Sequence, residues 1–105
     1  MRIVHYLTTS GSDPFQSWLD GLKDVKARVA ILRRADRLAV GNPGDYKFVR
    51  EGVWELRVDV GPGYRVYYGK QGNTFIVLLC GGSKRTQPAA IGCAVDFWKD
   101  YRRRQ

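Results

Sequence analysis

The sequence predicts an α+β fold in which an N-terminal strand and a helical hairpin pack on a twisted, mainly antiparallel sheet of four to five strands, with a C-terminal helix. Alternating apolar and polar residues between positions 45 and 80, interrupted by glycine turns, are typical of antiparallel strands. Apolar residues at helical spacing lie before these strands, at 13–40, and after them, at 88–101. The length of 105 residues suits one domain, which we expect to span 1–105.

The N-terminal part favours a strand followed by two helices. Residues 2–8 predict the strand, and Asp13, Pro14 and Gln16 form a helix start with an N-cap, a first-turn proline and a capping glutamine. A second helix is expected from about Asp24 to Val40, where a Gly-Asn-Pro-Gly run ends it. Its predicted buried stripe consists of Val25, Val29, Leu32, Ala35 and Ala39.

The strand at 45–49 turns back through a three-residue loop that ends in glycine. This register puts Tyr46 and Phe48 on the core face of the sheet, with the side chains of the next strand. Lys47 then lies opposite Glu55 on the exposed face, where it can either pair with this carboxylate or contact RNA.

The most informative stretch is the next hairpin, which has Gly61-Pro62-Gly63 at its turn. A three-residue loop places Arg57 opposite Tyr67, and Asp59 opposite Arg65, all on the exposed face. An even-numbered loop would instead bury Arg65, and an unpaired buried charge costs roughly several kcal/mol. Two guanidinium groups on one exposed sheet face indicate a phosphate-binding surface.

Residues 74–80 are apolar on both faces and predict the most buried strand. A mobile basic loop is expected at 81–87, before a final helix from about 88 to 101. The apolar stripe of this helix is predicted to be Ile91, Val95 and Trp98. A frayed basic tail is expected from about residue 102.

The charge favours a polyanionic partner. Eighteen Lys and Arg against 10 Asp and Glu give a net charge of +8, so nucleic acid is the first candidate and an acidic protein the second. No apolar run approaches the ~18 residues of a spanning helix, and no signal peptide is evident. We therefore expect a cytoplasmic protein without a membrane partner.

The few histidines and cysteines limit the chemistry. His5 is the only histidine, so neither a histidine-based triad nor a multi-histidine metal centre can form. Cys80 and Cys93 lie in apolar contexts and are expected to be buried free thiols. We expect no metal site and no cofactor, and any acid–base chemistry must use Lys, Arg, Tyr, Asp or Glu.

Six motifs carry a family resemblance. They are Phe15-x-x-Trp18-Leu19, Arg37-Leu38 before Gly41-Asn42, Gly44-Asp45-x-Lys47, Glu55-Leu56-Arg57, Gly61-Pro62-Gly63-Tyr64-Arg65-Val66-Tyr67 and Gly81-Gly82-x-Lys84-x-x-Gln87. In this order, over roughly residues 13–96, they resemble the addiction-module killer proteins, the HigB-like toxins of the RelE/ParE superfamily. The resemblance implies a toxin that cuts mRNA on the translating ribosome without a metal. It also implies a cognate antitoxin, usually a helix-turn-helix DNA-binding protein.

The resemblance also implies site residues. Arg65 matches the arginine that RelE-type toxins use near the scissile phosphate. Arg57 falls in a strand that carries functional basic residues in those toxins, and Lys84 lies in a strand-end loop where a basic catalytic residue is usual. We therefore expect Arg57, Arg65 and Lys84 to be catalytic. The expected RNA contacts are Lys47, Tyr67, Arg85 and Gln87, and the ring of Tyr67 can either stack on a base or pack within the protein.

The chemistry of RNA cleavage suits such residues. RNA supplies its own nucleophile, the 2′-hydroxyl, and the two arginines can stabilise negative charge on the phosphoryl group. Lys84 can stabilise charge or transfer a proton. The family's usual Tyr or His after this lysine is absent, because Gln87, Pro88 and Ala89 stand there. The acid–base assignment therefore stays open.

Other interpretations of the same residues stay open too. Arg57 can simply pair with Glu55 or Asp59 on a solvated sheet face, Arg65 can pair with Asp59, and Lys84 can be an ordinary loop charge. At the level of function, a ParE-like toxin would inhibit DNA gyrase and cut nothing. A third alternative is a basic domain that only binds RNA. The fold is shared by the two toxin types and does not decide between them.

Overall fold

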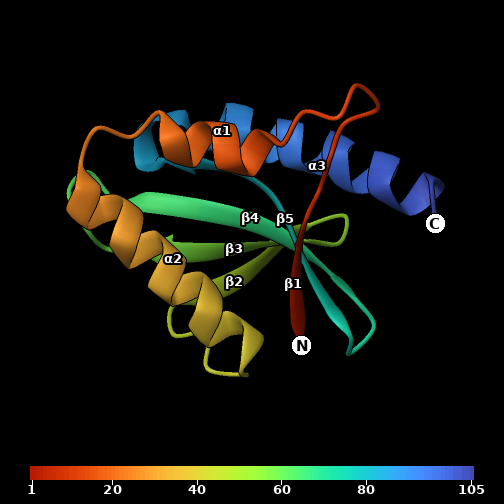
Figure 1. The fold of residues 1–105 in the computed structure, drawn as a ribbon, viewed down its shortest axis with the longest axis horizontal. Helices are drawn as coiled ribbons and strands as arrows, with labels where there is room; N and C mark the ends of the chain where they lie inside the picture. The colour runs from red at the N-terminus through yellow and green to blue at the C-terminus, as the bar shows by residue number, and fades with distance from the viewer.

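A computed structural model describes all 105 residues and contains one five-stranded sheet with the strand order β1-β5-β4-β3-β2 (Figure 1). The elements are β1 (Arg2–His5), α1 (Pro14–Asp20), α2 (Val25–Ala39), β2 (Tyr46–Arg50), β3 (Val53–Val58), β4 (Tyr64–Gln71), β5 (Phe75–Ser83), a 3₁₀ turn η1 (Lys84–Thr86) and α3 (Gln87–Arg103). Only β1 pairs in parallel, with β5; the other pairs are antiparallel. The predicted α+β class and mainly antiparallel sheet are confirmed.

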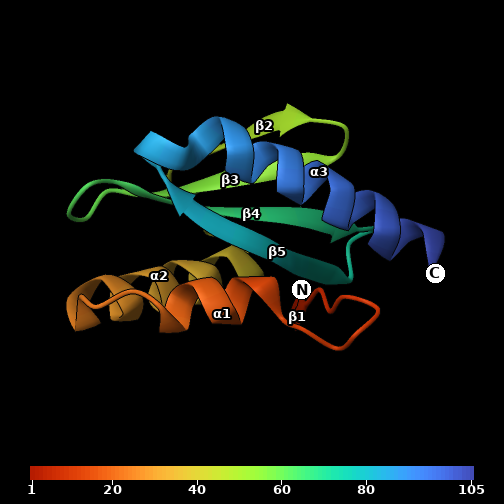
Figure 2. The same ribbon diagram turned by 90° about the horizontal axis from the view of Figure 1, so that it is seen from above.

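Helices cover both faces of the sheet: α1 and α2 pack on one face and α3 on the other (Figure 2). The core under α1 and α2 contains Phe15, Leu19, Ile31, Leu38, Leu56, Val58, Val66, Tyr68, Ile76 and Leu78. The core under α3 contains Tyr6, Val53, Tyr67, Val77, Leu79, Cys80, Ala94, Val95 and Trp98. The apolar run of β5 is buried on both faces for this reason, as its sequence predicted.

The starts of both N-terminal helices follow the predicted capping chemistry. The Asp13 side chain accepts a hydrogen bond from the backbone N–H of Gln16, and Pro14 occupies the first turn of α1. The Asp24 side chain accepts from the N–H groups of Lys26 and Ala27 at the start of α2. Such caps satisfy backbone donors that a helix start leaves unpaired.

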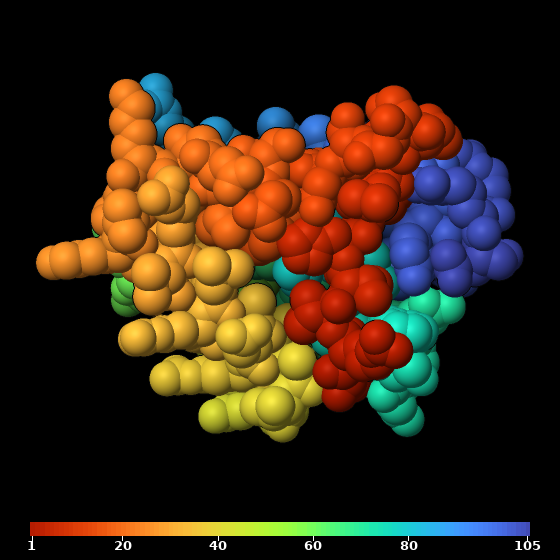
Figure 3. All heavy atoms as spheres, in the orientation of Figure 1, coloured from red at the N-terminus to blue at the C-terminus, as the bar shows by residue number.

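The predicted buried stripe of α2 is wrong except at Ala35. Val25, Val29 and Leu32 are 58%, 42% and 45% exposed. The residues that α2 buries are Ala27, Ile31, Ala35 and Leu38. This stripe combines two alanines, which let the helix approach the sheet, with two large side chains that fill the space on either side. The long side chains of α2 extend away from the body of the molecule in Figure 3.

Two strand glycines make room for tryptophans on opposite faces of the sheet. A Cβ at Gly81 in β5 would overlap the indole of Trp18 from α1, and a Cβ at Gly69 in β4 would overlap the indole of Trp98 from α3. Glycine in a strand interior often marks such a close approach. These contacts fix how α1 and α3 sit on the sheet.

The β3–β4 hairpin has a longer turn than predicted. β3 ends at Val58 and β4 begins at Tyr64, and these two residues pair directly. Arg57 therefore lies opposite Arg65, not opposite Tyr67. Since the predicted and observed turns both contain an odd number of residues, each side chain of these strands keeps its predicted face. The β2–β3 register is the predicted one from Tyr46 to Phe48, with Lys47 opposite Glu55. It then shifts, so that Arg50, which was expected in the loop, belongs to β2 and pairs with Val53.

The chain from residue 81 is more regular than expected. β5 continues through Ser83, and the expected basic loop is a 3₁₀ turn that leads directly into α3. The expected frayed tail is also wrong, because α3 extends to Arg103. The side chains of Arg103 and Arg104 both pair with Asp100 at 2.7 Å. None of the helices is long and apolar enough to span a membrane. Cys80 is buried as expected, whereas Cys93 is exposed.

Candidate cationic site

A cavity of about 340 Å³ lies at the end of the sheet where β3 and β4 meet. It is lined by Asp45, Arg57, Val58, Asp59, Gly61, Pro62, Gly63, Tyr64, Arg65 and Lys84. We call it the cationic cavity. The structure thus brings together the three residues that the sequence predicted to be catalytic, Arg57, Arg65 and Lys84.

Neighbouring elements position the three cations. Arg57 lies near the end of β3 and Arg65 near the start of β4, directly opposite each other. Lys84 opens η1, and its backbone N–H donates to the carbonyl of Gly63 at 3.0 Å, which ties the end of β5 to the β3–β4 turn. Backbone hydrogen bonds therefore connect the strands and the turn that line the cavity.

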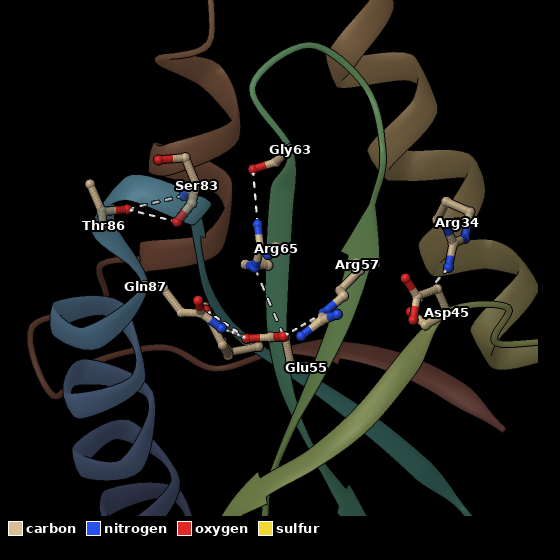
Figure 4. Close-up of polar contacts among 10 residues, drawn as sticks. Arg34, Asp45, Glu55, Arg57, Gly63, Arg65, Ser83, Thr86 and Gln87 are labelled. Carbon is tan, nitrogen blue, oxygen red and sulfur yellow. Dashed lines mark hydrogen bonds and ion pairs between the residues drawn. The ribbon is translucent and has the colours of Figure 1, made fainter.

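A buried carboxylate lies beneath the arginines. Glu55 is fully buried and accepts hydrogen bonds from Arg57 Nε at 3.0 Å, from the Tyr67 hydroxyl at 3.1 Å and from Gln87 Nε2 at 2.7 Å (Figure 4). Arg65 Nε lies 3.9 Å from the same carboxylate. Side chains from β3, β4 and α3 thus converge on one acidic group. Sequence reasoning placed Glu55 on a solvated face and missed this role.

The carboxylate offsets the repulsion between the two arginines. Like charges directly opposite each other on a sheet are destabilising, and Glu55 Oε1 is within ion-pair distance of both. Burial alone would raise the pKa of Glu55, but the hydrogen bonds from Arg57, Gln87 and Tyr67 outweigh it and hold this pKa below its usual value. Glu55 is therefore ionised at neutral pH and fixes the guanidinium groups above it.

The Arg65 side chain is not exposed as expected; only 11% of it is accessible. Its register on the predicted face is right, but that face is covered by α3 rather than solvated. The hydrogen bond of its guanidinium group runs from Nη1 to the Gly63 carbonyl at 3.3 Å, and Nε has no hydrogen-bond partner. Since that Nε is enclosed by protein, the guanidinium group can offer an anion in the cavity only its terminal N–H groups, of which Nη2 forms no hydrogen bond within the protein.

The expected role of Tyr67 in base stacking is wrong. Its side chain is fully buried in the core under α3, and its hydroxyl donates to Glu55. Burial and then the charge of Glu55 raise the pKa of Tyr67 well above its usual value. The ring packs inside the protein and cannot reach a base, so Tyr67 supports the carboxylate instead.

The remaining predicted contacts differ in exposure. Lys47, Lys84 and Arg85 are exposed, and none of them makes an ion pair within the protein. Gln87, the first residue of α3, is half-buried and donates to Glu55, so its amide is already engaged. Of these residues only Lys84 lines the cationic cavity.

Two aspartates complete the cavity lining. Asp59 lies in the β3–β4 turn instead of opposite Arg65, and its carboxylate forms no ion pair. The Asp45 carbonyl accepts from the backbone N–H of Arg57 and from Arg34 Nη2 of α2, which fixes the start of β2 beside the cavity (Figure 4). The cavity thus offers three cations for an anion and two nearby carboxylates.

Comparison with known protein families identifies the family to which this chain belongs. Residues 17–91 match the family described as phage derived protein Gp49-like. The chain belongs to the Gp49-like family. The matched segment contains the whole cationic cavity and the Glu55 network. The Gp49-like family is a RelE/ParE-type toxin-like family associated with the toxins of toxin–antitoxin modules.

A relative in Haemophilus influenzae is 51% identical over 77 residues, which is 73% of this chain and 78% of the relative. It is described as an uncharacterized protein. Membership of this toxin family also indicates that the protein has a cognate antitoxin as a partner.

Proposed function

We propose that this Gp49-like protein is a HigB-like toxin that cleaves mRNA on the translating ribosome and so inhibits translation. The observation that carries the proposal is the convergence of Arg57, Arg65 and Lys84 on one cavity. Guanidinium groups bind two phosphate oxygens at once, and positioned cations stabilise the extra charge of a phosphoryl transition state. Removal of one such donor typically costs ~10²–10³ in rate.

The proposed reaction is transesterification without a metal ion. The 2′-oxygen attacks the adjacent phosphorus and loses its proton, while the bond from phosphorus to the 5′-oxygen breaks and that oxygen gains a proton. The products are a 2′,3′-cyclic phosphate and a free 5′-hydroxyl. Arg57 and Arg65 hold the non-bridging oxygens, and Lys84, which is exposed and free of ion pairs, stabilises charge and can protonate the leaving oxygen.

The support beneath the arginines matters for this reaction. Catalytic groups must be held close to their productive geometry, and Glu55, Tyr67 and Gln87 supply that support through hydrogen bonds. The site contains no histidine, because His5 lies on β1 and pairs with Asp13. The ribosome is therefore proposed to align the message and to complete the proton transfers.

The proposed partners are the ribosome with its message, and an antitoxin of the helix-turn-helix HigA type. Both fit the charge of the chain, since its +8 balance favours polyanions and acidic protein surfaces. The proposed location is the cytoplasm, where translation takes place.

The experiment compares Lys84→Ala with wild type in cells that express the toxin, and new 5′ ends are mapped on all messages. Wild type is expected to arrest growth and to cut only translated regions. Lys84→Ala should lose most cleavage, about 10²-fold, with unchanged thermal stability because the side chain is exposed.

The matched control is Lys26→Ala, which removes the same charge from an exposed position on α2 that is not part of the cavity lining. This variant should cut like wild type. Growth arrest by Lys84→Ala as strong as that of wild type, without new 5′ ends in either, would contradict the proposal and favour gyrase inhibition.

A further inference from the structure

The sheet face that packs against α1 and α2 is left open at its β2 edge. Tyr46 and Phe48 lie on this face as predicted, yet they are 43% and 52% exposed. Both rings contact Trp54 of β3, with centroid separations of 5.9 Å for Tyr46 and 5.3 Å for Phe48. We call these three rings the aromatic surface. Exposed aromatic rings gathered on one surface often mark a binding site.

Positive charge lies beside the rings. The exposed Lys70 of β4 places Nζ 4.2 Å from the centre of the Trp54 ring. The N-terminal ammonium of Met1 is held at the carbonyl of Ala39 at 2.9 Å, and Met1 and Lys70 line one cavity with Tyr46. An aromatic platform edged by cations is the arrangement that binds single-stranded nucleic acid.

A cavity of about 230 Å³ adjoins the aromatic surface. Tyr46 and Lys70 line it together with Tyr68, whose hydroxyl is enclosed by protein and has no hydrogen-bond partner. The cavity thus lies beside both a ring of the aromatic surface and the Lys70 cation.

The aromatic surface also adjoins the cationic cavity along the chain. Asp45 lines that cavity, and Tyr46 is the next residue and the first of β2. An RNA strand held at the cationic cavity would have to pass around the start of β2 to reach the aromatic surface, which lies on the opposite face of the sheet.

We propose that the aromatic surface binds unpaired bases of the single-stranded RNA that leads away from the cationic cavity. Tyr46 and Phe48 provide the stacking faces, and Lys70 contacts a phosphate. The identity of the ligand as RNA rests on the proposed function. The cations beside the rings favour an RNA over a purely apolar protein segment.

The test measures binding of a fluorescently labelled, unstructured 12-nucleotide RNA by anisotropy at several KCl concentrations. Tyr46→Ala/Phe48→Ala should weaken binding by about tenfold or more, since base stacking is lost. The slope of log K against log [KCl] should stay unchanged, because no phosphate contact is removed. Lys70→Ala should lower that slope by about 1.

The matched control is Val29→Ala/Leu32→Ala, which truncates two exposed apolar side chains on α2. It should bind the RNA like wild type, and thermal unfolding should show that both double variants fold. Equal RNA affinity of Tyr46→Ala/Phe48→Ala and wild type would overturn the inference and leave the aromatic surface as a protein contact.

The two experiments distinguish a failure of the RNA-binding inference from a failure of the nuclease proposal. If the aromatic variant loses affinity for RNA while wild type cuts no message on ribosomes, the surface inference stands and the nuclease proposal falls. If Lys84→Ala abolishes cleavage while the aromatic variant binds RNA normally, the surface inference falls alone.

Discussion

Two adjacent residues of β3 build two different regions of the molecule. Glu55 points to the α3 face, where it is buried and its carboxylate accepts three side-chain hydrogen bonds. Trp54 points to the opposite face, where it lies among exposed rings beside a cation. The alternation of a strand separates the two side chains although they are neighbours in sequence.

The difference concerns how each region holds its polar groups. In the cationic cavity the charges are fixed by a buried partner, which suits precise placement of a phosphate. In the aromatic surface the rings of Tyr46 and Phe48 are exposed, which suits tolerant stacking on any base. We infer that the first region sets the chemistry and the second holds the strand.

The largest expected effect comes from removing the buried carboxylate. Glu55→Ala should lower the free energy of unfolding by about 3–5 kcal/mol, because Arg65 is left buried without a counter-charge. Urea denaturation measures the change. Glu51→Ala is the control, since its carboxylate pairs with Arg50 and Lys99 in a largely exposed setting and should cost ~1 kcal/mol or less. Equal losses of unfolding free energy in the two variants would show that Glu55 stabilises the fold no more than an exposed carboxylate does.

Two adjacent tyrosines give a smaller and sharper comparison. Tyr67→Phe removes a hydroxyl that donates to the ionised Glu55 and should cost ~1.5–3 kcal/mol in free energy of unfolding. Tyr68→Phe removes a hydroxyl without a partner and should be neutral or stabilising. Thermal and urea unfolding of both variants would measure the difference. If Tyr68→Phe lost as much unfolding free energy as Tyr67→Phe, this result would contradict the assignment of a paired hydroxyl to Tyr67 and an unpaired one to Tyr68.

The smallest expected effect is in the pH dependence of stability. The pKa of Glu55 is lowered in the folded protein, so the unfolded state binds its proton first as pH falls. The carboxylate therefore stabilises the fold above its unfolded pKa of ~4.3, and this contribution is lost as pH falls through the lower folded value. The stability difference between wild type and Glu55→Gln should shrink from about pH 5 downward. A difference that is constant between pH 7 and pH 3 would contradict this assignment.

The sequence predicted the elements well because their signals are local. Asp13 and Asp24 cap helices, and odd-numbered glycine turns fix which face each strand residue takes. The prediction of the buried stripe of α2 failed because apolar residues occur on two sides of that helix. Small Ala27 and Ala35 lie on the side that faces the sheet, and only the tertiary packing chooses between the stripes.

The sequence predicted that the three cations of the candidate site lie together, but not how deeply the site is buried. Arg57, Arg65 and Lys84 do line one cavity, since strand ends near one turn lie together. Tyr67 and Arg65 were expected to be exposed because the alternation shows two faces but not that α3 covers the second one. The Glu-x-Arg spacing in β3 was the available signal for the buried ion pair, and it was interpreted as a solvated pair.

The most direct test of the central claim is the chemistry of the cut. Purified protein acts on ribosomes programmed with a defined message, and mass spectrometry identifies the new ends. The account predicts a 2′,3′-cyclic phosphate on the upstream fragment, cleavage by Lys84→Ala reduced about 10²-fold, and no cleavage of a message that carries a 2′-deoxynucleotide at the scissile position. Cleavage of the deoxy-substituted message, or an upstream fragment that ends in a free 3′-hydroxyl, would contradict it.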